Sequence, residues 1–340
     1  MPGTLVVRAP NHLGDLVLAL PALQRARPDA IVVRRPLLPL LEMARLPGQL
    51  IPLDRGLVPL IQIAARLRTA RYARGVLLTP SLSSAVLFRL AGMPARRGTA
   101  TDGRSPLLTD RVEPASLANE HRASAYLVLV GDTLPAVPPV PELSPDAHAR
   151  ERWHALIGEA RGLIGIFPGS NASSRRWEPG HFGELTHRLA DAGKRTVIFG
   201  GPGERHLTAA AAGSHGIDLG GKTDLAVLAA GLAECRMLVT NDSGPMHLAA
   251  AVGTPTISLW GAGNPAETGP LGAGHRVLRH AELPCVPCRA NTCPRSGRGT
   301  VLPRAERECL ELITVDEVMT AIAQQPEIGQ PFRLPRSAKP

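Results

Sequence analysis

One stretch in the second half of the chain constrains the fold more than any other. Residues 237–261 contain an apolar run, the polar sequence Asn-Asp-Ser-Gly-Pro-Met-His, an alanine-rich segment and a second apolar run. The two apolar runs predict buried strands. The segment between them predicts a helix that Asp242 or Ser243 can cap and that Gly253 ends. The stretch therefore predicts one strand–helix–strand unit.

The start of this predicted helix is suited to binding phosphate. A helix that follows a strand directs its free N–H groups and the positive end of its dipole toward the carboxyl edge of the sheet, where phosphate binds readily. Gly244 lets a ligand approach the backbone closely, and His247, one turn further on, can donate to a phosphate or ribose oxygen. A helix cap and a packed histidine would give the same pattern, so this motif alone leaves both interpretations open.

Length and composition predict a folded protein of two domains. The 340 residues exceed a usual single core, and 44% of them are hydrophobic. Lys and Arg number 38 against 29 Asp and Glu, and the net charge of +9 favours phosphorylated ligands or an anionic membrane face. Nucleic acid is not an expected partner, because the sequence has no basic stripe interleaved with aromatics and no helix-turn-helix or zinc-finger spacing.

The sequence predicts a cytoplasmic protein that can touch the inner membrane surface. Its first residues lack the basic start, long apolar core and cleavage site of a signal peptide. The stretch from Ser243 to Ala266 has no formal charge, but prolines and glycines interrupt it repeatedly, which argues against a spanning helix. Five cysteines, an odd number, argue against a disulfide framework.

Strands and helices alternate along the whole chain. Thr4 to Arg8 predicts a strand, and a helix follows from about Leu16 to Arg27, with Asp15 at its start. The proline-rich residues 135–141 read as a linker, after which the alternation restarts. We expect an α/β protein with two Rossmann-like, doubly wound domains that face a central cleft, at residues 1–141 and 142–325, followed by a flexible basic tail at residues 326–340.

Two loops of the predicted second domain add to the phosphate site. One contains Ser170 and Asn171, followed by the pair Arg175 and Arg176. Small polar residues followed by arginines suit a pyrophosphate, because guanidinium groups bind its oxygens in bidentate fashion, although a solvated basic loop remains an alternative. In the other loop, Glu204 can accept a hydrogen bond from a ribose hydroxyl. The chain has neither the Gly-x-Gly-x-x-Gly pattern nor a Walker loop, which disfavours a dinucleotide or P-loop site.

Taken together, these motifs resemble glycosyltransferase family nine, the ADP-heptose:lipopolysaccharide heptosyltransferases, and are most similar to its heptosyltransferase II branch. The resemblance runs almost from end to end. It rests on Leu13-Gly14-Asp15, on Pro168-Gly169-Ser170 with Arg175-Arg176-Trp177, on the Asp242-to-His247 signature, and on Cys288, Cys293-Pro294 and Cys309.

The resemblance implies a GT-B fold that transfers heptose with inversion and without a catalytic metal or cofactor. The donor, ADP-heptose, would be held by the C-terminal domain, and an inner-core sugar on lipid A would be the acceptor on the N-terminal domain. By motif match, Asp15 takes the general-base position and Arg175 the position of a lysine that neutralises the diphosphate. The donor-binding positions would be Ser170, Asn171, Arg176, Glu204, Asp242, Ser243, Gly244 and His247.

The implied mechanism is physically coherent. Charge that builds on the leaving diphosphate would be stabilised by Arg175 and by the helix start at Ser243 and Gly244, while Asp15 accepts the proton of the attacking hydroxyl. The chain departs from the family pattern in having arginine at position 175 and Glu178 where a proline usually follows the tryptophan. The first departure keeps the charge, whereas the second leaves the shape of the loop open.

The late cysteines allow two interpretations. Cys285, Cys288 and Cys293, with the more distant Cys309, could ligate zinc. The spacing is not that of a standard finger, however, and two prolines crowd it, so reduced thiols in a loop are the favoured interpretation and no metal site is expected.

Two other functions remain open at this point. A sugar-nucleotide epimerase on the same fold would also bind a nucleotide diphosphate against this helix, and a non-catalytic nucleotide-binding protein would need no base at Asp15. The sequence leaves the acceptor's position in the core, the nucleotide base and the oligomeric state open.

Overall fold

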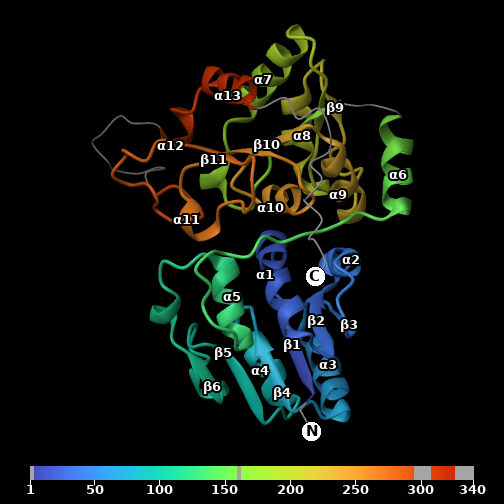
Figure 1. Cartoon of the computed structure of the whole chain (residues 1–340), viewed down its shortest axis with the longest axis vertical. Coiled ribbons are helices and arrows are strands. Elements are labelled where there is room, and N and C mark those ends of the chain that lie inside the picture. The colour runs from blue at the N-terminus through green and yellow to red at the C-terminus, as the bar shows by residue number, and fades with distance from the viewer. Residues whose placement is uncertain (1–3, 159–161, 295–307, 326–340) are drawn as a thin grey trace, which may run out of the picture. The chain divides into compact units, whose positions relative to one another are not determined.

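A computed structural model of the chain describes residues 4–158, 162–294 and 308–325. It divides into two compact units, Met1–Pro141 and Glu142–Pro340 (Figure 1). The boundary follows directly on the proline-rich residues 135–141, which carry no helix or strand. The expected tail at 326–340 lies outside the described residues.

The first unit is built on a parallel six-stranded sheet in the order β3-β2-β1-β4-β5-β6. All of its neighbouring strands run parallel. In this doubly wound order the direction of winding reverses between β1 and β4, where ligands usually bind beyond the carboxyl ends of the strands. The strands are β1 (Leu5–Arg8), β2 (Ala30–Arg34), β3 (Gln49–Leu53), β4 (Arg74–Leu77), β5 (Ala95–Thr99) and β6 (Asp110–Val112).

Helices cover both faces of this sheet (Figure 1). Helices α1 and α5 pack together, and α3 packs with α4 against a core that includes Val6, Val32 and Phe88. Because both faces are covered, the central strands β1 and β2 are almost wholly apolar and buried. The helices are α1 (Leu13–Ala26), α2 (Leu38–Met43), α3 (Leu57–Ala70), α4 (Leu82–Leu90) and α5 (Arg122–Val130), with 3₁₀ turns at Arg35–Leu37, Ser105–Leu107 and Pro114–Leu117.

The second unit repeats this plan with the order β12-β11-β10-β7-β8-β9, again parallel throughout. Its winding reverses between β7 and β10, so the expected ligand position lies beyond the ends of these two strands. The strands are β7 (Ile164–Phe167), β8 (Thr196–Ile198), β9 (Ile217–Asp218), β10 (Met237–Asn241), β11 (Thr256–Trp260) and β12 (Arg276–Arg279).

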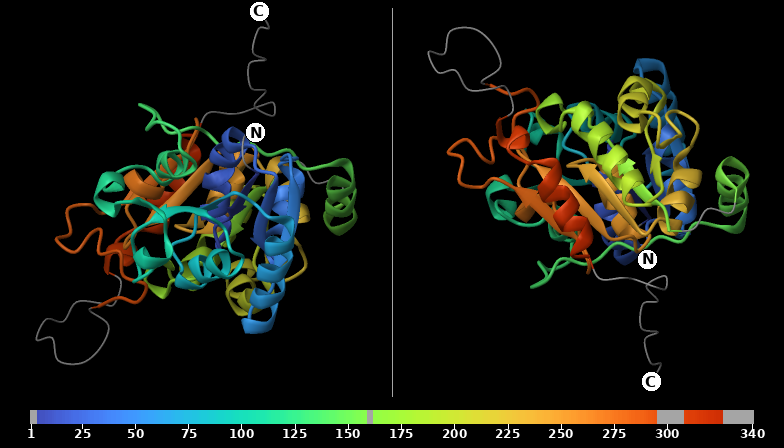
Figure 2. Two further views of the ribbon diagram at one scale, coloured as in Figure 1. Left: turned by 90° about the horizontal axis from the view of Figure 1, so that it is seen from below. Right: turned by 90° about the horizontal axis from the view of Figure 1, so that it is seen from above.

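Helices also cover both faces of the second sheet. Helix α7 packs with α8 and α13 on one face (Figure 2), while α9 packs with α6 and α10. Trp177 is fully buried in the core beneath α7, and its indole N–H donates to the carbonyl of Ile313 at 2.9 Å, which ties the end of the described chain to this core. The helices are α6 (Ala147–Ile157), α7 (Pro179–Asp191), α8 (Arg205–Ala212), α9 (Leu225–Glu234), α10 (Gly244–Ala251), α11 (Pro265–Thr268), α12 (Glu308–Glu311) and α13 (Val315–Ala323), with 3₁₀ turns at Ser173–Arg175 and Pro202–Glu204.

The strand–helix–strand prediction is confirmed as β10, α10 and β11, with β10 and β11 paired in parallel. The prediction that the Ser243 side chain caps this helix is wrong. Ser243 occupies the N-cap position of α10, but its side chain makes no capping hydrogen bond and instead lies 3.1 Å from the hydroxyl of Thr240. Among the described helices, none has the length and apolar character needed to cross a bilayer.

Candidate functional site

The reversal point of the second sheet brings two predicted loops together. Asn241, at the end of β10, is fully buried, and its side-chain amide donates to the carbonyl of Pro168 at 2.8 Å and accepts from the backbone N–H of Trp177 at 2.9 Å. The hydroxyl of Ser170 donates to the carbonyl of Asp242 at 3.2 Å. Since both loops leave the carboxyl ends of neighbouring strands, these bonds fix one polar site at the position where doubly wound sheets bind ligands.

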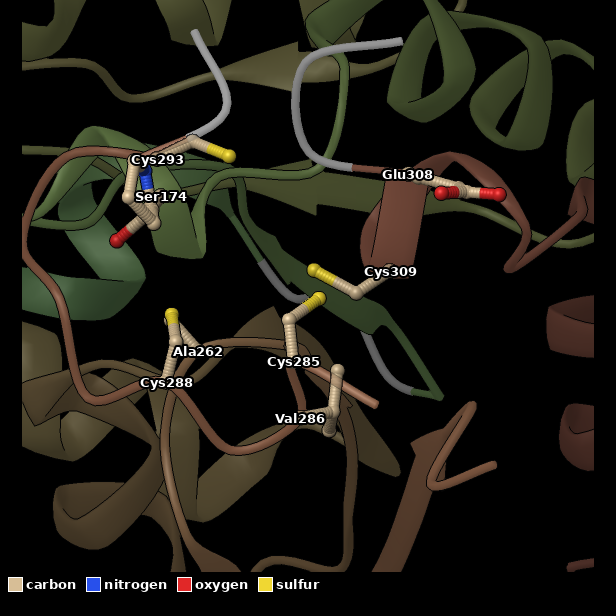
Figure 3. Close-up of a pocket in the computed structure, with 10 residues that line it drawn as sticks. Ser174, Ala262, Cys285, Val286, Cys288, Cys293, Glu308 and Cys309 are labelled. Carbon is tan, nitrogen blue, oxygen red and sulfur yellow. The ribbon is translucent and has the colours of Figure 1, made fainter. Parts of the chain in front are cut away.

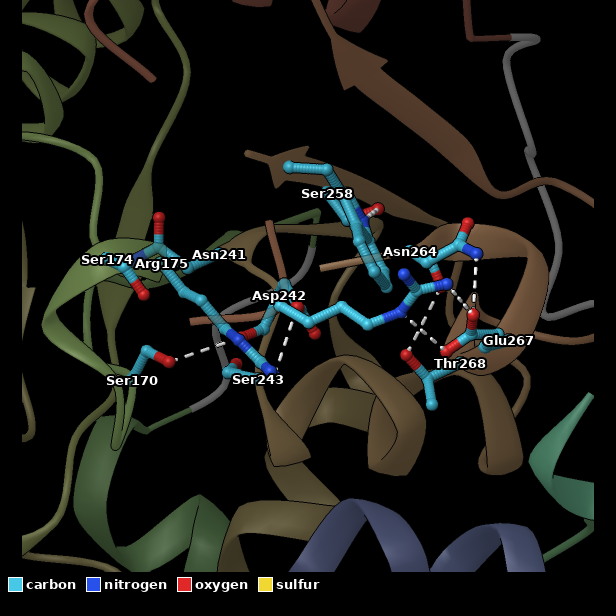
Figure 4. A network of polar contacts seen from close by, with 12 residues as sticks. Ser170, Ser174, Arg175, Asn241, Asp242, Ser243, Ser258, Asn264, Glu267 and Thr268 are labelled. Carbon is cyan, nitrogen blue, oxygen red and sulfur yellow. Dashed lines mark hydrogen bonds and ion pairs between the residues drawn. The ribbon is translucent and has the colours of Figure 1, made fainter. Parts of the chain in front are cut away.

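The central charge pair of this site joins Arg175 to Asp242. Figure 4 shows the Arg175 side chain extending toward Asp242 and Ser243. A guanidinium nitrogen of Arg175 lies 3.2 Å from the carboxylate of Asp242, whose side chain is only 5% exposed, whereas the Arg175 side chain is 30% exposed. The Nε atom of Arg175 is buried and has no hydrogen-bond acceptor among the described residues. The arginine therefore retains donor capacity for an anion that enters the site.

The start of α10 contributes backbone donors beside this pair. Ser243 leaves the N-terminal N–H groups of the helix without a side-chain cap, and Pro245 removes one of those donors. Unpaired N–H groups at a helix start favour negative charge. His247 lies further along α10 and is only 6% exposed, so little of its ring is accessible. The arrangement suits a diphosphate at the helix start, and the predicted role of His247 stays a prediction.

Several of the expected donor-binding residues also hold the loops in place. Arg176 donates from Nε to the carbonyl of Ser170 at 2.7 Å. The carboxylate of Glu204 accepts from the backbone N–H of Gly201 at 2.8 Å and lies against Gly169, where a side chain would collide with it. Asn171 is exposed on the same loop. These positions are consistent with a donor site, while the predicted contacts with ribose and diphosphate remain predictions.

Asp15 lies in the first turn of α1, directly after β1 and at the reversal point of the first sheet. Its Oδ1 atom is 3.1 Å from a guanidinium nitrogen of Arg122, at the start of α5. The buried hydroxyl of Tyr126, one turn further along α5, is hydrogen-bonded to both Asp15 and Arg122. Burial, and after it the negative charge of Asp15, raises the pKa of Tyr126 well above its usual value, so this hydroxyl remains a donor.

Arg122 and Tyr126 were absent from the sequence predictions. They reach Asp15 because α1 and α5 pack together on one face of the sheet. Arg122 is 107 positions from Asp15 in the chain, and no local motif marks either partner. Only the tertiary packing reveals that the expected general base is held by a cation and a phenol.

A buried arginine at the same edge of the first sheet was also missed. Arg8, at the end of β1, is 2% exposed and donates to the carbonyls of Ala9 and Val32 and to the side chain of Asn11. Burial, followed by the nearby charge of Arg34, lowers the pKa of Arg8 to about 10. All three of these acceptors are neutral groups.

The four late cysteines come together around one pocket of the second unit. Cys285, Cys288, Cys293 and Cys309 all line this pocket. Burial, together with the three neighbouring thiols, raises the pKa of the Cys309 thiol to about 11. The interpretation of these cysteines as reduced thiols stays a prediction, and Cys309 lies in helix α12 and not in a loop.

Comparison with known proteins identifies the family. The model of glycosyltransferase family 9 (heptosyltransferase) matches residues 60–297. The chain belongs to this family. It is therefore a glycosyltransferase of the heptosyltransferase type, as expected, and the epimerase alternative is not favoured.

Curated relatives and solved structures agree with this assignment. Lipopolysaccharide heptosyltransferase 2 of Escherichia coli (strain K12) is 31% identical over 306 residues, which is 81% of this chain and 87% of that protein. Its counterpart from Salmonella typhimurium is 30% identical, with the same shares covered. The solved structure of E. coli ADP-heptose lps heptosyltransferase II covers 94% of this chain and 97% of its own, with a TM-score of 0.77 and 25% identity. The GT-B fold is thereby confirmed.

Proposed function

We propose that this glycosyltransferase transfers heptose from ADP-heptose to an inner-core sugar of lipopolysaccharide, with inversion at the anomeric carbon. The observation that carries the proposal is the site at the end of β7 and β10, where Arg175, with its unused donor, meets the uncapped start of α10. The relatives support the choice of donor and acceptor, since their names specify heptosyltransferases of lipopolysaccharide and that of the solved E. coli structure also specifies ADP-heptose. A transfer assay with a panel of nucleotide sugars tests the donor, and only ADP-heptose should support rapid transfer to a heptose-deficient core.

In the proposed mechanism, the acceptor oxygen attacks the anomeric carbon as the bond to the diphosphate breaks. The proton of the acceptor hydroxyl passes to the carboxylate of Asp15, which Arg122 and Tyr126 hold in place. The electron pair of the broken bond goes to the β-phosphate of the departing ADP. Arg175 and the N–H groups of α10 stabilise that charge as it develops. These fixed groups supply the role that a metal ion has in other transferases.

This mechanism predicts that transfer does not require a dissociable metal ion. We expect the initial rate to be unchanged when EDTA is added in excess to the assay, because the leaving-group charge is met by protein groups. The measurement is the initial rate of heptose transfer with and without EDTA added to the assay. A rate that falls with EDTA and recovers with magnesium would contradict the assignment to Arg175 and α10.

Tyr126 is proposed to position Asp15, and it can be tested with a conservative change. Tyr126→Phe should lower turnover about tenfold or more, because a buried hydrogen bond to a charged group contributes about 1.5 kcal/mol or more and every 1.4 kcal/mol is a factor of ten. The donor KM should change little, since Tyr126 lies in the first unit. Steady-state kinetics with thermal unfolding checks both effects. The chain's other tyrosine offers a matched control, Tyr72→Phe, which should leave turnover unchanged; equal loss in both variants would refute a positioning role.

We further propose that the protein acts in the cytoplasm and meets its acceptor at the inner membrane surface. Leu57, Val58 and Ile61, at the start of α3, are 69%, 65% and 50% exposed. Helix α3 follows β3, so this apolar group lies on the same sheet edge as Asp15. The net charge of +9 complements anionic lipid. Co-sedimentation should be stronger with anionic than with neutral vesicles and should weaken in Val58→Ser; equal recovery in all cases would contradict the proposal.

A further inference from the structure

The lining of the pocket formed by the four late cysteines includes none of the residues assigned to catalysis. Cys285, Cys288 and Cys293 belong to the segment after β12, and Cys309 lies in α12. Figure 3 shows the four side chains arranged around the pocket. The chain's remaining cysteine, Cys235, is buried elsewhere, next to Gly165 of β7. Four of the chain's five cysteines therefore gather at this one pocket. The proposed mechanism of transfer assigns no role to them.

The chemistry of this pocket is that of a soft-metal site. Apart from the cysteines, its lining is mostly small or apolar, including Ala262, Val286 and Pro294. Four thiolates are the ligand set that zinc and iron prefer, in tetrahedral geometry. The first two spacings, two residues from Cys285 to Cys288 and four from Cys288 to Cys293, fall within the range typical of zinc-binding pairs.

We propose that Cys285, Cys288, Cys293 and Cys309 bind one metal ion, zinc in preference to iron, in a closed structural site. In the described ranges, no three of the chain's His, Cys, Asp or Glu side chains already stand in a metal-binding arrangement. Binding therefore requires the cysteine side chains to rotate and the segment 285–294 to move inward. That segment contains no helix or strand, so its backbone can adjust. Metal binding of this kind is coupled to local folding.

The proposed metal would stabilise the loop that carries Arg175. The hydroxyl of Ser174 donates to the carbonyl of Ala290, and the backbone N–H of Ser174 donates to the carbonyl of Asn291 at 3.3 Å. In the same segment, the N–H of Arg289 donates to the carbonyl of Ala262 at 2.7 Å, and its guanidinium contacts Glu267. A metal bound by the cysteines would fix the segment 285–294 and, through these hydrogen bonds, would hold Ser174, the residue next to Arg175. The chemical step itself stays with the groups already assigned.

Metal content decides the proposal without any reference to activity. The full chain should be expressed with zinc and iron present and purified without chelator. Elemental mass spectrometry should then find about one metal ion per chain, mostly zinc. A mercurial reagent that modifies thiols should release this metal in proportion to the thiols consumed. Cys288→Ser should lower the metal content several-fold and lower the unfolding temperature. Cys235→Ala, the matched control, should keep the metal.

Two results would overturn the proposal. One is a folded, metal-free wild-type protein that takes up no zinc on dialysis against zinc-containing buffer. The other is an intact mass two hydrogens below that of the reduced chain, which would show that a pair of these cysteines forms a disulfide instead. If Cys288→Ser fails to fold, the metal content of the wild-type protein and the release of that metal by the mercurial reagent still test whether the cysteines bind a metal ion. These readouts do not involve heptose transfer. A protein without the metal would therefore leave the proposed function standing, and a protein without heptose transfer would leave the metal site standing.

Discussion

Replacing Asp15 with asparagine is expected to lower the rate of heptose transfer by about two orders of magnitude or more, since loss of a general base typically has that effect. Asparagine keeps the size of the side chain and can still accept a hydrogen bond from Arg122, but it cannot take the proton of the acceptor hydroxyl. Donor affinity should stay near that of the wild type, because Asp15 lies in the first unit. Single-turnover transfer rates and calorimetric titration with ADP separate the two effects.

A second aspartate in the first unit provides the control. Asp54 follows β3 and pairs with the exposed Arg35 at 2.7 Å, so Asp54→Asn removes a carboxylate from a surface ion pair. Such pairs contribute little to stability, and this variant should transfer heptose at the wild-type rate. If Asp15→Asn also turns over normally, Asp15 is only the polar start of a helix and the base must be sought elsewhere.

The fold was largely predictable because its strongest signals are local. Apolar runs of strand length, separated by helical segments and by glycine or proline, mark buried parallel strands such as β10 and β11. The edge strands β6 and β12 carry no such signal. Two of the three residues of β6 are exposed, and β12 is half-buried along its length. An edge strand that is not covered on both faces loses the continuous apolar pattern by which it could be recognised.

The candidate site was predictable only where strand ends converge. Ser170, Arg175 and Asp242 lie together because they follow β7 and β10, which are neighbours in the sheet. The ion pair itself was not foreseen, because the sequence does not specify which side chains face one another across two loops. The same limit applies to Tyr126, which reaches Asp15 through the packing of one helix on another. Motif position thus predicts which loop carries a residue, and tertiary packing determines its partner.

Arg175→Ala should weaken ADP binding about tenfold or more and should lower turnover further still. A charge-assisted hydrogen bond contributes about 1.5–3 kcal/mol, and every 1.4 kcal/mol changes an equilibrium constant tenfold. Charge on the leaving diphosphate grows toward the transition state, so the lost interaction affects the rate more than it affects donor binding. Calorimetric titration with ADP, combined with single-turnover rates, measures the two effects on the same preparations.

The carboxylate of Asp242 makes this prediction sharper. The Asp242 side chain is 5% exposed and its carboxylate lies 3.2 Å from Arg175, so the alanine variant leaves a buried negative charge close to the expected diphosphate without that cation. Adding Asp242→Asn should then restore part of the lost ADP affinity, because the repulsion is removed along with the attraction. Arg188→Ala, which removes an exposed arginine on α7, should bind ADP normally. If Arg175→Ala binds ADP and transfers heptose like the wild type, the Arg175–Asp242 pair only shapes the loop, and the diphosphate is stabilised by other groups.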